Sequence, residues 1–260
     1  GTQLSRLSNR WWDADDQYEW GGAHHLLPEG YGSLLEKLRV GLDVRLNHVL
    51  TSVQDTKVGV RVTAMRAGGL QVVFEADAVI VTMPLGVLKS SPPTFSPPLP
   101  SRKRNAIRRL GFGTLNKVLL VFKEAFWSDL EGSRDFWGVC SRSAKLRGEA
   151  FQFWNMQRVT GRPIVLALHA GRASRRLSPR SEAEAEAIRV TMNALRNVFG
   201  KAVPEPLGSM VTRWEDEPYS RGVYTHIPIG ASADDYDIMA EPLWDGRLLW
   251  AGEHTCREHP

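Results

Sequence analysis

The stretch Arg247-Leu-Leu-Trp-Ala-Gly-Glu-His-Thr-Cys-Arg-Glu-His-Pro260 decides the fold class. Its apolar run, Leu248–Ala251, is typical of a buried strand, and Gly252-Glu253 follows, where a backbone without a Cβ can approach a ligand closely. In cofactor-binding α/β units, a strand that ends in Gly-Glu leads into a helix, and no helix follows here. We therefore expect an α/β cofactor-binding unit, and we expect the chain to be a fragment of a longer protein.

The composition favours a globular protein. With 260 residues, 42% of them hydrophobic and 24% charged, the chain is long enough for one large or two smaller domains. Its longest apolar stretches, such as Ala78–Val81 and Ile164–Leu168, are much shorter than the roughly 20 residues of a membrane span. We therefore expect no membrane partner. Two cysteines, Cys140 and Cys256, provide neither a disulfide framework nor a metal cluster, which fits a reducing compartment.

Charged residues are unevenly distributed around a net charge of +4 and an isoelectric point near 9.2. Two basic clusters and one acidic stretch stand out: Arg102, Lys103, Arg104, Arg108 and Arg109; Arg172, Arg175, Arg176 and Arg180; and Asp13, Asp15, Asp16 and Glu19. A protein that binds a cation near its start and tolerates a polyanion elsewhere has this pattern. Solvated surface clusters without a specific partner have it too.

Helical and strand patterns alternate along the chain without internal repeats. Apolar spacing predicts a helix over Leu34–Leu38 and a second over Glu182–Phe199, with Ser181 as its N-cap. Period-two alternation predicts half-buried strands at Val44–Asn47 and Val58–Thr63.

A nearly continuous apolar run, Ala76–Pro84, predicts a strand buried on both faces. The proline-rich stretch Pro92–Pro100 predicts a rigid connector that leads to Ser101, the expected N-cap of a helix over Arg102–Leu110. Further strands are predicted at Val118–Phe122, Phe151–Asn155, Ile164–His169, Val211–Trp214 and Gly222–Ile227. A parallel strand pair from the two ends of the chain, with a separate sheet between, indicates two interleaved domains.

Five stretches form an ordered series of motifs: Thr82-Met-Pro-Leu-Gly-Val-Leu-Lys89, Leu110-Gly-Phe-Gly-Thr-Leu-Asn-Lys117, Arg213-Trp-Glu-Asp-Glu-Pro-Tyr-Ser-Arg-Gly222, Asp234-Asp-Tyr-Asp-Ile-Met-Ala-Glu241 and Ala251-Gly-Glu-His-Thr255. In this order they resemble successive motifs of the flavin-dependent amine oxidases. Within that family, the chain most resembles the lysine-specific histone demethylases, because it carries Trp12-Asp-Ala-Asp-Asp16, Phe153-Trp-Asn155 and this form of the lysine motif. The resemblance spans essentially the whole chain.

The resemblance implies a mixed α/β amine oxidase fold, truncated at both ends. A Rossmann-like FAD-binding domain (residues 19–113 and 230–260) would be interleaved with a mixed-sheet substrate domain (residues 1–18 and 114–229). The Gly-x-Gly-x-x-Gly turn that cradles the diphosphate is missing from this sequence. Gly111-Phe-Gly113 does not replace it, because it has the wrong spacing and precedes a strand.

Lys117 is the catalytic residue that the resemblance implies, placed beside the reactive edge of the flavin, where it holds a water near N5. A cation there stabilises the negative charge of reduced flavin. The implied FAD contacts are the backbone of Leu50 at the adenine, Thr82 and Met83 beneath the dinucleotide, Glu253 at the phosphate and ribityl end, and the aromatic side chains of Trp214 and Tyr219.

The implied substrate site is lined by Trp154 and Tyr224, whose aromatic faces favour a methylated ammonium. Asp15, Asp16, Glu19 and His24 match positions that contact the basic histone tail, for which carboxylates provide steering and hydrogen bonds. The sequence departs from the demethylase pattern at Tyr219, where tryptophan is frequent, and at His226, where an aromatic residue is frequent. Gln17 interrupts a longer acidic run found in some relatives.

Three functions stay open at this stage. The favoured one is FAD-dependent oxidative demethylation of mono- and dimethyl-lysine in histone tails, in the nucleus, giving formaldehyde and hydrogen peroxide. A polyamine oxidase would use the same chemistry on small cations. A non-catalytic amine-oxidase-like module would bind histone tails without turnover. A corepressor and nucleosomal DNA are further expected partners, through parts outside this chain.

Overall fold

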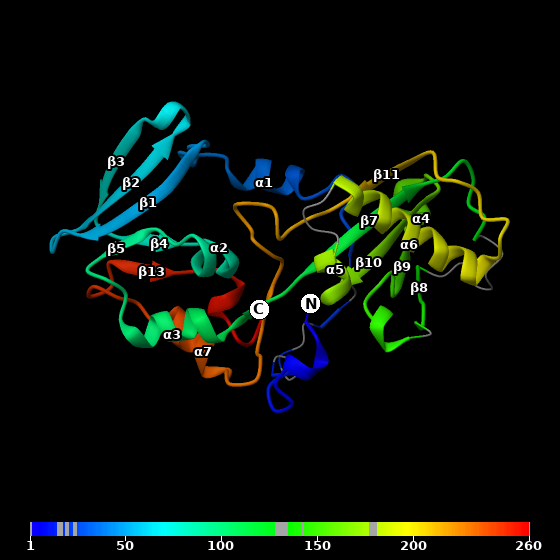
Figure 1. Ribbon diagram of the computed structural model, residues 1–260. Coiled ribbons are helices and arrows are strands. Elements are labelled where there is room, and N and C mark those ends of the chain that lie inside the picture. The colour runs from blue at the N-terminus through cyan, green and yellow to red at the C-terminus, as the bar shows by residue number, and fades with distance from the viewer. Residues whose placement is uncertain are drawn as a thin grey trace. The chain divides into compact units, whose positions relative to one another are not determined.

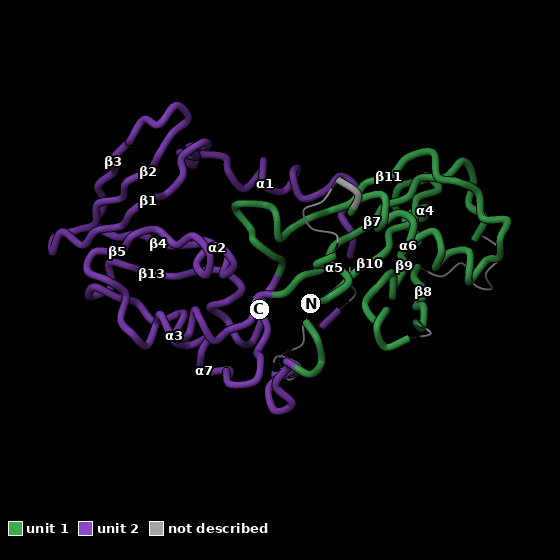
Figure 2. The backbone as a smooth tube through the Cα atoms, viewed as in Figure 1, with its two compact units in different colours: residues 1–5, 113–223 green, residues 6–112, 224–260 purple. Residues whose placement is uncertain are grey.

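The computed structural model describes residues 2–14, 18, 21–22, 25–127, 135–141, 143–176 and 181–259. The chain forms two compact units, each assembled from two separate stretches (Figure 2). Unit 1 contains residues 1–5 and 113–223, and unit 2 contains residues 6–112 and 224–260. The expected interleaved, mixed α/β fold is therefore confirmed. The predicted boundaries after residues 113 and 229 lie close to the changes between units, and residues 6–14 group with unit 2.

Unit 1 is built on a five-stranded antiparallel sheet in the order β11-β7-β10-β9-β8 (Figure 1). Its elements are β7 (Leu115–Val121), β8 (Phe136–Gly138), η4 (Ala144–Leu146), β9 (Gln152–Asn155), α4 (Gln157–Thr160), β10 (Ile164–Ala170), α5 (Arg172–Arg176), α6 (Ser181–Phe199) and β11 (Gly208–Val211). The strands predicted at Val118–Phe122, Phe151–Asn155 and Ile164–His169 and the long helix are thus present, with shifted ends.

The core of unit 1 lies between this sheet and α6. In β7 every second residue is apolar and fully buried, as at Val118 and Leu120, and the same alternation in β10 buries Val165 and Ala167. The apolar side of α6 packs against these side chains through Ala187, Met192 and Leu195. Each large apolar side chain buried in this way contributes about 1.5–3 kcal/mol, so the alternation fixes which face of the sheet is covered.

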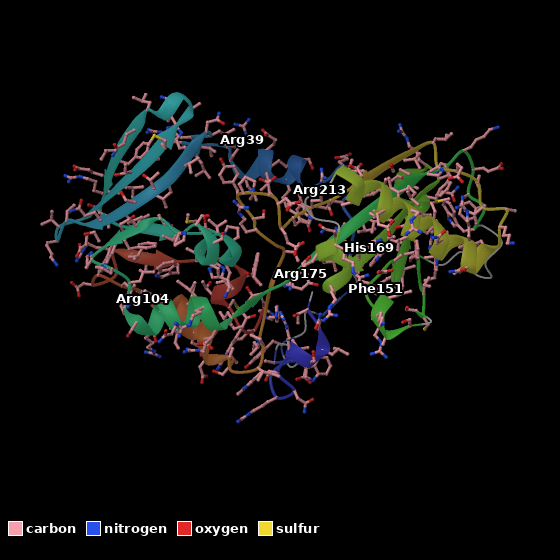
Figure 3. All side chains as sticks on the ribbon, viewed as in Figure 1. Arg39, Arg104, Phe151, His169, Arg175 and Arg213 are labelled. Atoms are coloured by element: carbon pink, nitrogen blue, oxygen red, sulfur yellow. The ribbon has the colours of Figure 1, made fainter. Side chains whose placement is uncertain are left out.

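His169 is a neutral imidazole within this core, on β10 (Figure 3). The Thr191 hydroxyl donates to the Ala187 carbonyl at 2.8 Å, so its oxygen accepts the Nε2–H of His169 at 2.9 Å. Nδ1 then accepts the Ala150 N–H at 3.4 Å. Both ring nitrogens are engaged by the neutral form, and burial lowers the pKa of His169 to about 4.

We expect His169 to make unit 1 less stable in mild acid. Because the folded-state pKa of about 4 lies below the ordinary value of 6.5, the unfolded chain binds the proton more strongly. The contribution is complete above pH 6.5 and is lost as the pH falls toward 4, a difference of about 3 kcal/mol. Urea unfolding between pH 7.5 and 4.5 measures it. His169→Gln should lose this part of the pH dependence, and an unchanged profile would contradict the assignment.

Unit 2 contains a four-stranded sheet, order β3-β2-β1-β5, and two two-stranded pairs, β12-β6 and β13-β4. Its elements are α1 (Gly32–Leu38), β1 (His48–Asp55), β2 (Val60–Arg66), η3 (Ala67–Gly69), β3 (Gln71–Ala76), β4 (Val79–Val81), α2 (Leu85–Ser90), β5 (Thr94–Ser96), α3 (Ser101–Arg109), β6 (Gly111–Phe112), β12 (Thr225–His226), α7 (Asp234–Ala240), β13 (Leu248–Trp250) and η5 (Glu253–Thr255); η1 (Leu4–Arg6) spans the change of unit near the start. Strands β4 and β13 run parallel, which confirms the expected pairing of strands from distant parts of the chain.

Two lysines join the helices of unit 2 through backbone carbonyls. Lys89, on α2, donates to the carbonyls of Ile107, Arg108 and Leu110 at 2.7, 2.9 and 2.7 Å. Lys103, on α3, donates to the carbonyls of Met239 and Glu241 at 2.9 and 2.8 Å, at the end of α7. A cation at a helix C-terminus satisfies orphan carbonyls and interacts favourably with the helix dipole. Burial lowers the pKa of both lysines, that of Lys103 to about 8.

The prediction of a strand buried on both faces at Ala76–Pro84 is wrong. Ala76 ends β3, a bend follows, and β4 contains three residues. Val81 is 3% exposed against the core, whereas Ile80, which points to the opposite face, is 59% exposed. A continuous apolar run does not reveal which of its two faces is covered.

Three other local predictions are corrected by side-chain hydrogen bonds or backbone angles. Val44–Asn47 is not a strand, because Asn47 adopts a left-handed φ of 59° and the strand starts at His48. The strand predicted at Val211–Trp214 ends at Val211, since the Trp214 N–H bonds to the Asn116 side chain. Ser101 is the first residue of α3 and not its N-cap, a position that Pro100 occupies.

Candidate active site

Lys117 lies on the less buried face of the unit 1 sheet. Because side chains alternate along β7, its neighbour Val118 points into the core while Lys117 is exposed on the opposite side. Its N–H donates to Thr212 Oγ1 at 2.8 Å, and its carbonyl accepts the Thr212 N–H at 2.9 Å. Within the described part of the chain its ammonium has no ion pair. The structure thus fixes the backbone of this lysine and leaves its charge available.

Trp154 lies on the same face of this sheet. Lys117 is paired with Leu168, and Trp154 is paired with Leu166, two residues away on β10. Paired residues of antiparallel strands point to the same side, as do residues two apart on one strand. Trp154 is half-buried, with its ring 5.5 Å from that of Phe136. The predicted catalytic lysine and the predicted aromatic wall therefore project from one sheet face.

Asn116 positions the segment that carries Trp214. It is fully buried, its Nδ2 donates to Ser174 Oγ at 2.8 Å, and its Oδ1 accepts the Trp214 N–H at 3.1 Å. The Thr114 and Ser174 hydroxyls are also hydrogen-bonded, with their oxygens 2.6 Å apart. A buried amide needs such partners, so this network holds the backbone of Trp214 against the strand of Lys117. The Trp214 side chain is 42% exposed, and Tyr219 is 62% exposed.

Glu215 is a half-buried carboxyl beside Trp214 that was not predicted as a site residue. Burial raises its pKa, against the opposing effects of a hydrogen bond from Thr114 and the charge of Arg175, whose Nε lies 3.6 Å from Oε1. Its Oε2 has no hydrogen-bond partner among the described residues. The sequence feature that could have identified Glu215 is its position directly after Trp214, the tryptophan of the Arg213–Gly222 motif. Ser174, by contrast, has no signal in the sequence.

In unit 2, the carboxyl ends of β4 and β13 bring four predicted or motif residues together. Val81 pairs with Trp250, and the Ala251 N–H donates to the Val81 carbonyl at 3.0 Å. Thr82 and Met83 therefore follow one strand beside Gly252 and Glu253, which follow the other. Ligands of open α/β sheets bind beyond the carboxyl ends of the strands.

Gly252 leaves this edge accessible to a ligand. Its φ of 133° strains any residue with a side chain, and a Cβ would lie 2.9 Å from the His254 ring. The combination of parallel strand ends and a required glycine fits the close approach of a dinucleotide.

Glu253 is held in its charged form by Thr225. The Thr225 N–H donates to Oε2 at 2.9 Å, and the Thr225 hydroxyl donates to Oε1 at 2.7 Å. Burial acts to raise the pKa of Glu253, but these two bonds and the neighbouring His254, 3.6 Å away, outweigh it and lower the pKa. Its side chain thus faces the protein, so its backbone, and not its carboxylate, is available to a cofactor. Thr225 was missed because a strand threonine has no distinctive signal.

The residues that line a pocket of about 300 Å³ in unit 2 include Glu253, Tyr224, Trp12 and His226. Tyr224 is 40% exposed, and burial of its phenol raises its pKa. His226 pairs across β12 and β6 with Gly111, where a Cβ would lie 2.2 Å from the imidazole. The first glycine of Gly-Phe-Gly is thus needed to accommodate His226, one of the two departures from the demethylase pattern.

Leu50, the implied adenine contact, lies on β1 among residues packed against the unit 2 core. On one side β1 pairs with β2, and on the other side β5 pairs with Ser52–Gln54. Within the described residues, no strand covers the second edge of β1 at Leu50.

The predicted histone-contact residues Asp15, Asp16, Glu19 and His24 lie outside the described residues. Within the described part of the chain, no cluster of three or more His, Cys, Asp or Glu side chains could bind a metal. The helices in that same part include none with the length and apolar character of a membrane span. Cys140 and Cys256 are free thiols.

A sequence model of flavin containing amine oxidoreductases matches residues 3–260. Lysine-specific histone demethylase 1 homolog 3 of Arabidopsis thaliana is 40% identical over 99% of this chain and 16% of its own length. Protein FLOWERING LOCUS D of the same plant is 41% identical over 99% of this chain and 32% of its own length. Possible lysine-specific histone demethylase 1 of Drosophila melanogaster is 37% identical over 100% of this chain and 31% of its own length. The chain thus spans a third or less of these three relatives.

Among solved structures, wild-type putrescine oxidase bound to putrescine is similar, with a TM-score of 0.70 and 20% sequence identity. The match covers 87% of this chain and 47% of that chain. At this identity the likeness establishes the fold, and it agrees with the mixed sheets of the two units.

Proposed function

Because this chain belongs to the flavin-containing amine oxidoreductase family, we propose that its protein oxidatively demethylates mono- and dimethyl-lysine in histone tails. The observation that carries this proposal is the 37–41% identity to relatives named as lysine-specific histone demethylase 1 or its homologues, along essentially the whole chain. Putrescine oxidase shares the fold at 20% identity. Demethylation of histones also implies a nuclear location for the protein.

The carboxyl edge of β4 and β13 is the proposed place for FAD. Thr82, Met83 and the backbone at Gly252-Glu253 would hold the dinucleotide, and the open edge at Leu50 would meet the adenine. When bound, FAD would supply the two-electron oxidation of the methylamine, and its reoxidation by oxygen would yield hydrogen peroxide. The Glu253 carboxylate is held by the Thr225 N–H and hydroxyl, so the contact proposed at this residue is made by its backbone.

Lys117 is the proposed catalytic residue of this reaction. Its exposed ammonium provides a positive charge that stabilises developing negative charge on the cofactor and orients a water. Asn116 keeps the neighbouring Trp214 segment in place through its buried amide. Trp154, Trp214, Tyr219 and Tyr224 are the proposed aromatic walls, which exclude water and attract a methylated ammonium.

The substrate preference follows from the chemistry of the amine. Loss of hydride to form an imine requires a lone pair on nitrogen, which mono- and dimethyl-lysine have after losing a proton and trimethyl-lysine lacks. Water then converts the imine to formaldehyde and the demethylated lysine. Asp15, Asp16, Glu19 and His24 are proposed contacts for the basic tail, whose charge they complement. A corepressor and nucleosomal DNA are proposed as further partners of the protein.

The test uses histone peptides that differ in one methyl group. We expect the FAD-loaded protein to release hydrogen peroxide and formaldehyde in equal amounts from mono- and dimethyl-lysine peptides and neither product from the trimethyl peptide. Spermine and putrescine are the comparison substrates. If kcat/KM for these polyamines exceeds that for the peptides, the protein is a polyamine oxidase. Tight peptide binding without peroxide from any substrate would favour a non-catalytic module.

A further inference from the structure

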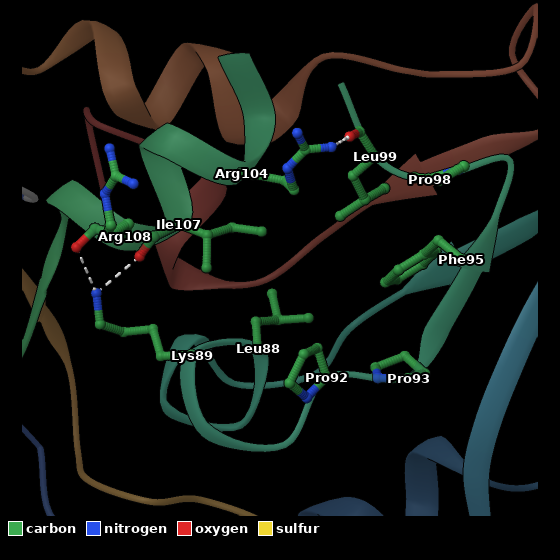
Figure 4. Close-up of a pocket in the computed structure, with 10 residues that line it drawn as sticks. All are labelled: Leu88, Lys89, Pro92, Pro93, Phe95, Pro98, Leu99, Arg104, Ile107 and Arg108. Carbon is green, nitrogen blue, oxygen red and sulfur yellow. Dashed lines mark hydrogen bonds between the residues drawn. The ribbon is translucent and has the colours of Figure 1, made fainter. Parts of the chain in front are cut away.

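A pocket of about 490 Å³ lies in unit 2, separate from every residue assigned to the proposed reaction (Figure 4). Its lining comes from α2, from the proline-rich segment after it and from α3: Leu88, Lys89, Pro92, Pro93, Phe95, Pro98, Leu99, Arg104, Ile107 and Arg108. Leu88 and Ile107 face each other across the pocket, with Phe95 at one side (Figure 4). This volume is in the range of small-molecule sites.

The walls of this pocket are fixed by hydrogen bonds. Lys89 uses all three of its N–H groups on the carbonyls of Ile107, Arg108 and Leu110, which ties α2 to the end of α3. The Arg104 guanidinium donates to the Leu99 carbonyl on the other side. Prolines restrict the backbone between these points. The pocket is therefore preformed, which lowers the entropic cost of binding a ligand.

The basic cluster on α3 is unevenly neutralised. Arg102 pairs with Glu241 at 2.8 Å, Arg109 pairs with the buried Asp235, and Lys103 is bound to two carbonyls. Arg104 and Arg108, four residues apart and thus on the same side of the helix, have no ion pair among the described residues. These two arginines are the members of the cluster that line the apolar pocket.

From this arrangement we propose that the pocket is a binding site for a small anionic amphiphile, with an apolar body against Leu88, Phe95 and Ile107 and a carboxylate held by Arg104 and Arg108. Guanidinium groups match carboxylates in geometry and are weakly hydrated, so they bind such a head group even at a partly exposed rim. A cationic ligand would be repelled, and a neutral one would gain the apolar contacts alone. The proposal does not depend on the proposed oxidase activity.

The test compares three probes with the same ten-carbon chain: decanoate, 1-decanol and decyltrimethylammonium, each below its micelle concentration. Isothermal titration at low salt should give an affinity for decanoate about tenfold higher than for decanol, and weaker binding for the cation. Methyl NMR shifts should appear at Leu88, Leu99 and Ile107. Equal affinities for all three probes, no binding, or shifts confined to other methyl groups would each overturn the proposal.

Variants separate the charge from the apolar pocket. Arg108→Gln keeps the Arg104–Leu99 bond and should remove part of the preference for decanoate. Arg104→Gln with Arg108→Gln should make decanoate and decanol bind equally. Arg102→Gln is the matched control, because Arg102 lies on the same helix outside the pocket and should leave the preference unchanged. Thermal melting of each variant checks that it is folded, and an undiminished preference in the folded double variant would refute the assignment.

Discussion

Lys117→Ala is expected to lower the kcat of the FAD-loaded protein by about 10²–10³-fold, the effect of removing one electrostatic contact with developing charge. The substitution should leave FAD binding and the melting temperature nearly unchanged. The reason is that the Lys117 side chain is exposed and without an ion pair in the described residues, while its backbone bonds to Thr212 do not involve the side chain. Stopped-flow measurement of flavin reduction and of reoxidation by oxygen would show which half-reaction slows.

Lys123→Ala is the matched control for this experiment, since Lys123 is an exposed lysine that follows the same strand. It should leave both half-reactions unchanged. Normal rates in Lys117→Ala would remove the residue from the mechanism. Equal losses in the two variants would point to the general charge of unit 1.

The sheet of unit 1 could be predicted from the sequence because its alternation is regular. One face of β7 and β10 is buried against α6, so every second residue of these strands is apolar, and this alternation indicates which face is buried. The same reasoning gave a wrong prediction at Ala76–Pro84. This run is apolar on both faces, whereas the described residues cover only one of the two faces. The strand prediction at Val44–Asn47 was wrong because Asn47 has a left-handed backbone conformation. The alternation of apolar and polar residues contains no information about this conformation.

For the candidate site, the sequence predicted residue types and could not predict their contacts. Lys117 and Trp154 share a face because β10 lies between their strands, a relation that sequence spacing alone does not contain. Asn116 and Ser174 bond across 58 positions, and Thr225 bonds to Glu253 across 28. Such pairs depend on the folded topology, so a single sequence identifies at most one partner.

Lys103 is another residue whose burial and contacts could not be predicted from the sequence. In the sequence it was one member of a basic cluster on a helix, and its spacing gave no reason to separate it from its exposed neighbours. In the structure it is 2% exposed, lies 4.8 Å above the Trp250 ring, and bonds to carbonyls 136 and 138 positions away. A residue type that is almost never fully buried without partners therefore joins α3, α7 and β13.

Lys103→Ala is accordingly expected to lower the free energy of unfolding by about 3 kcal/mol, because it opens a cavity and leaves the carbonyls of Met239 and Glu241 without their donor. The melting temperature should fall by roughly 6–12 °C. Lys103→Met retains most of the buried volume while removing the charge, so it should lose less than the alanine variant. Arg102→Ala, at an exposed position of the same helix, should change stability by less than about 1 kcal/mol. Urea denaturation of the three variants measures these differences, and an alanine variant at Lys103 as stable as the one at Arg102 would show that the buried ammonium does not hold α3 against α7.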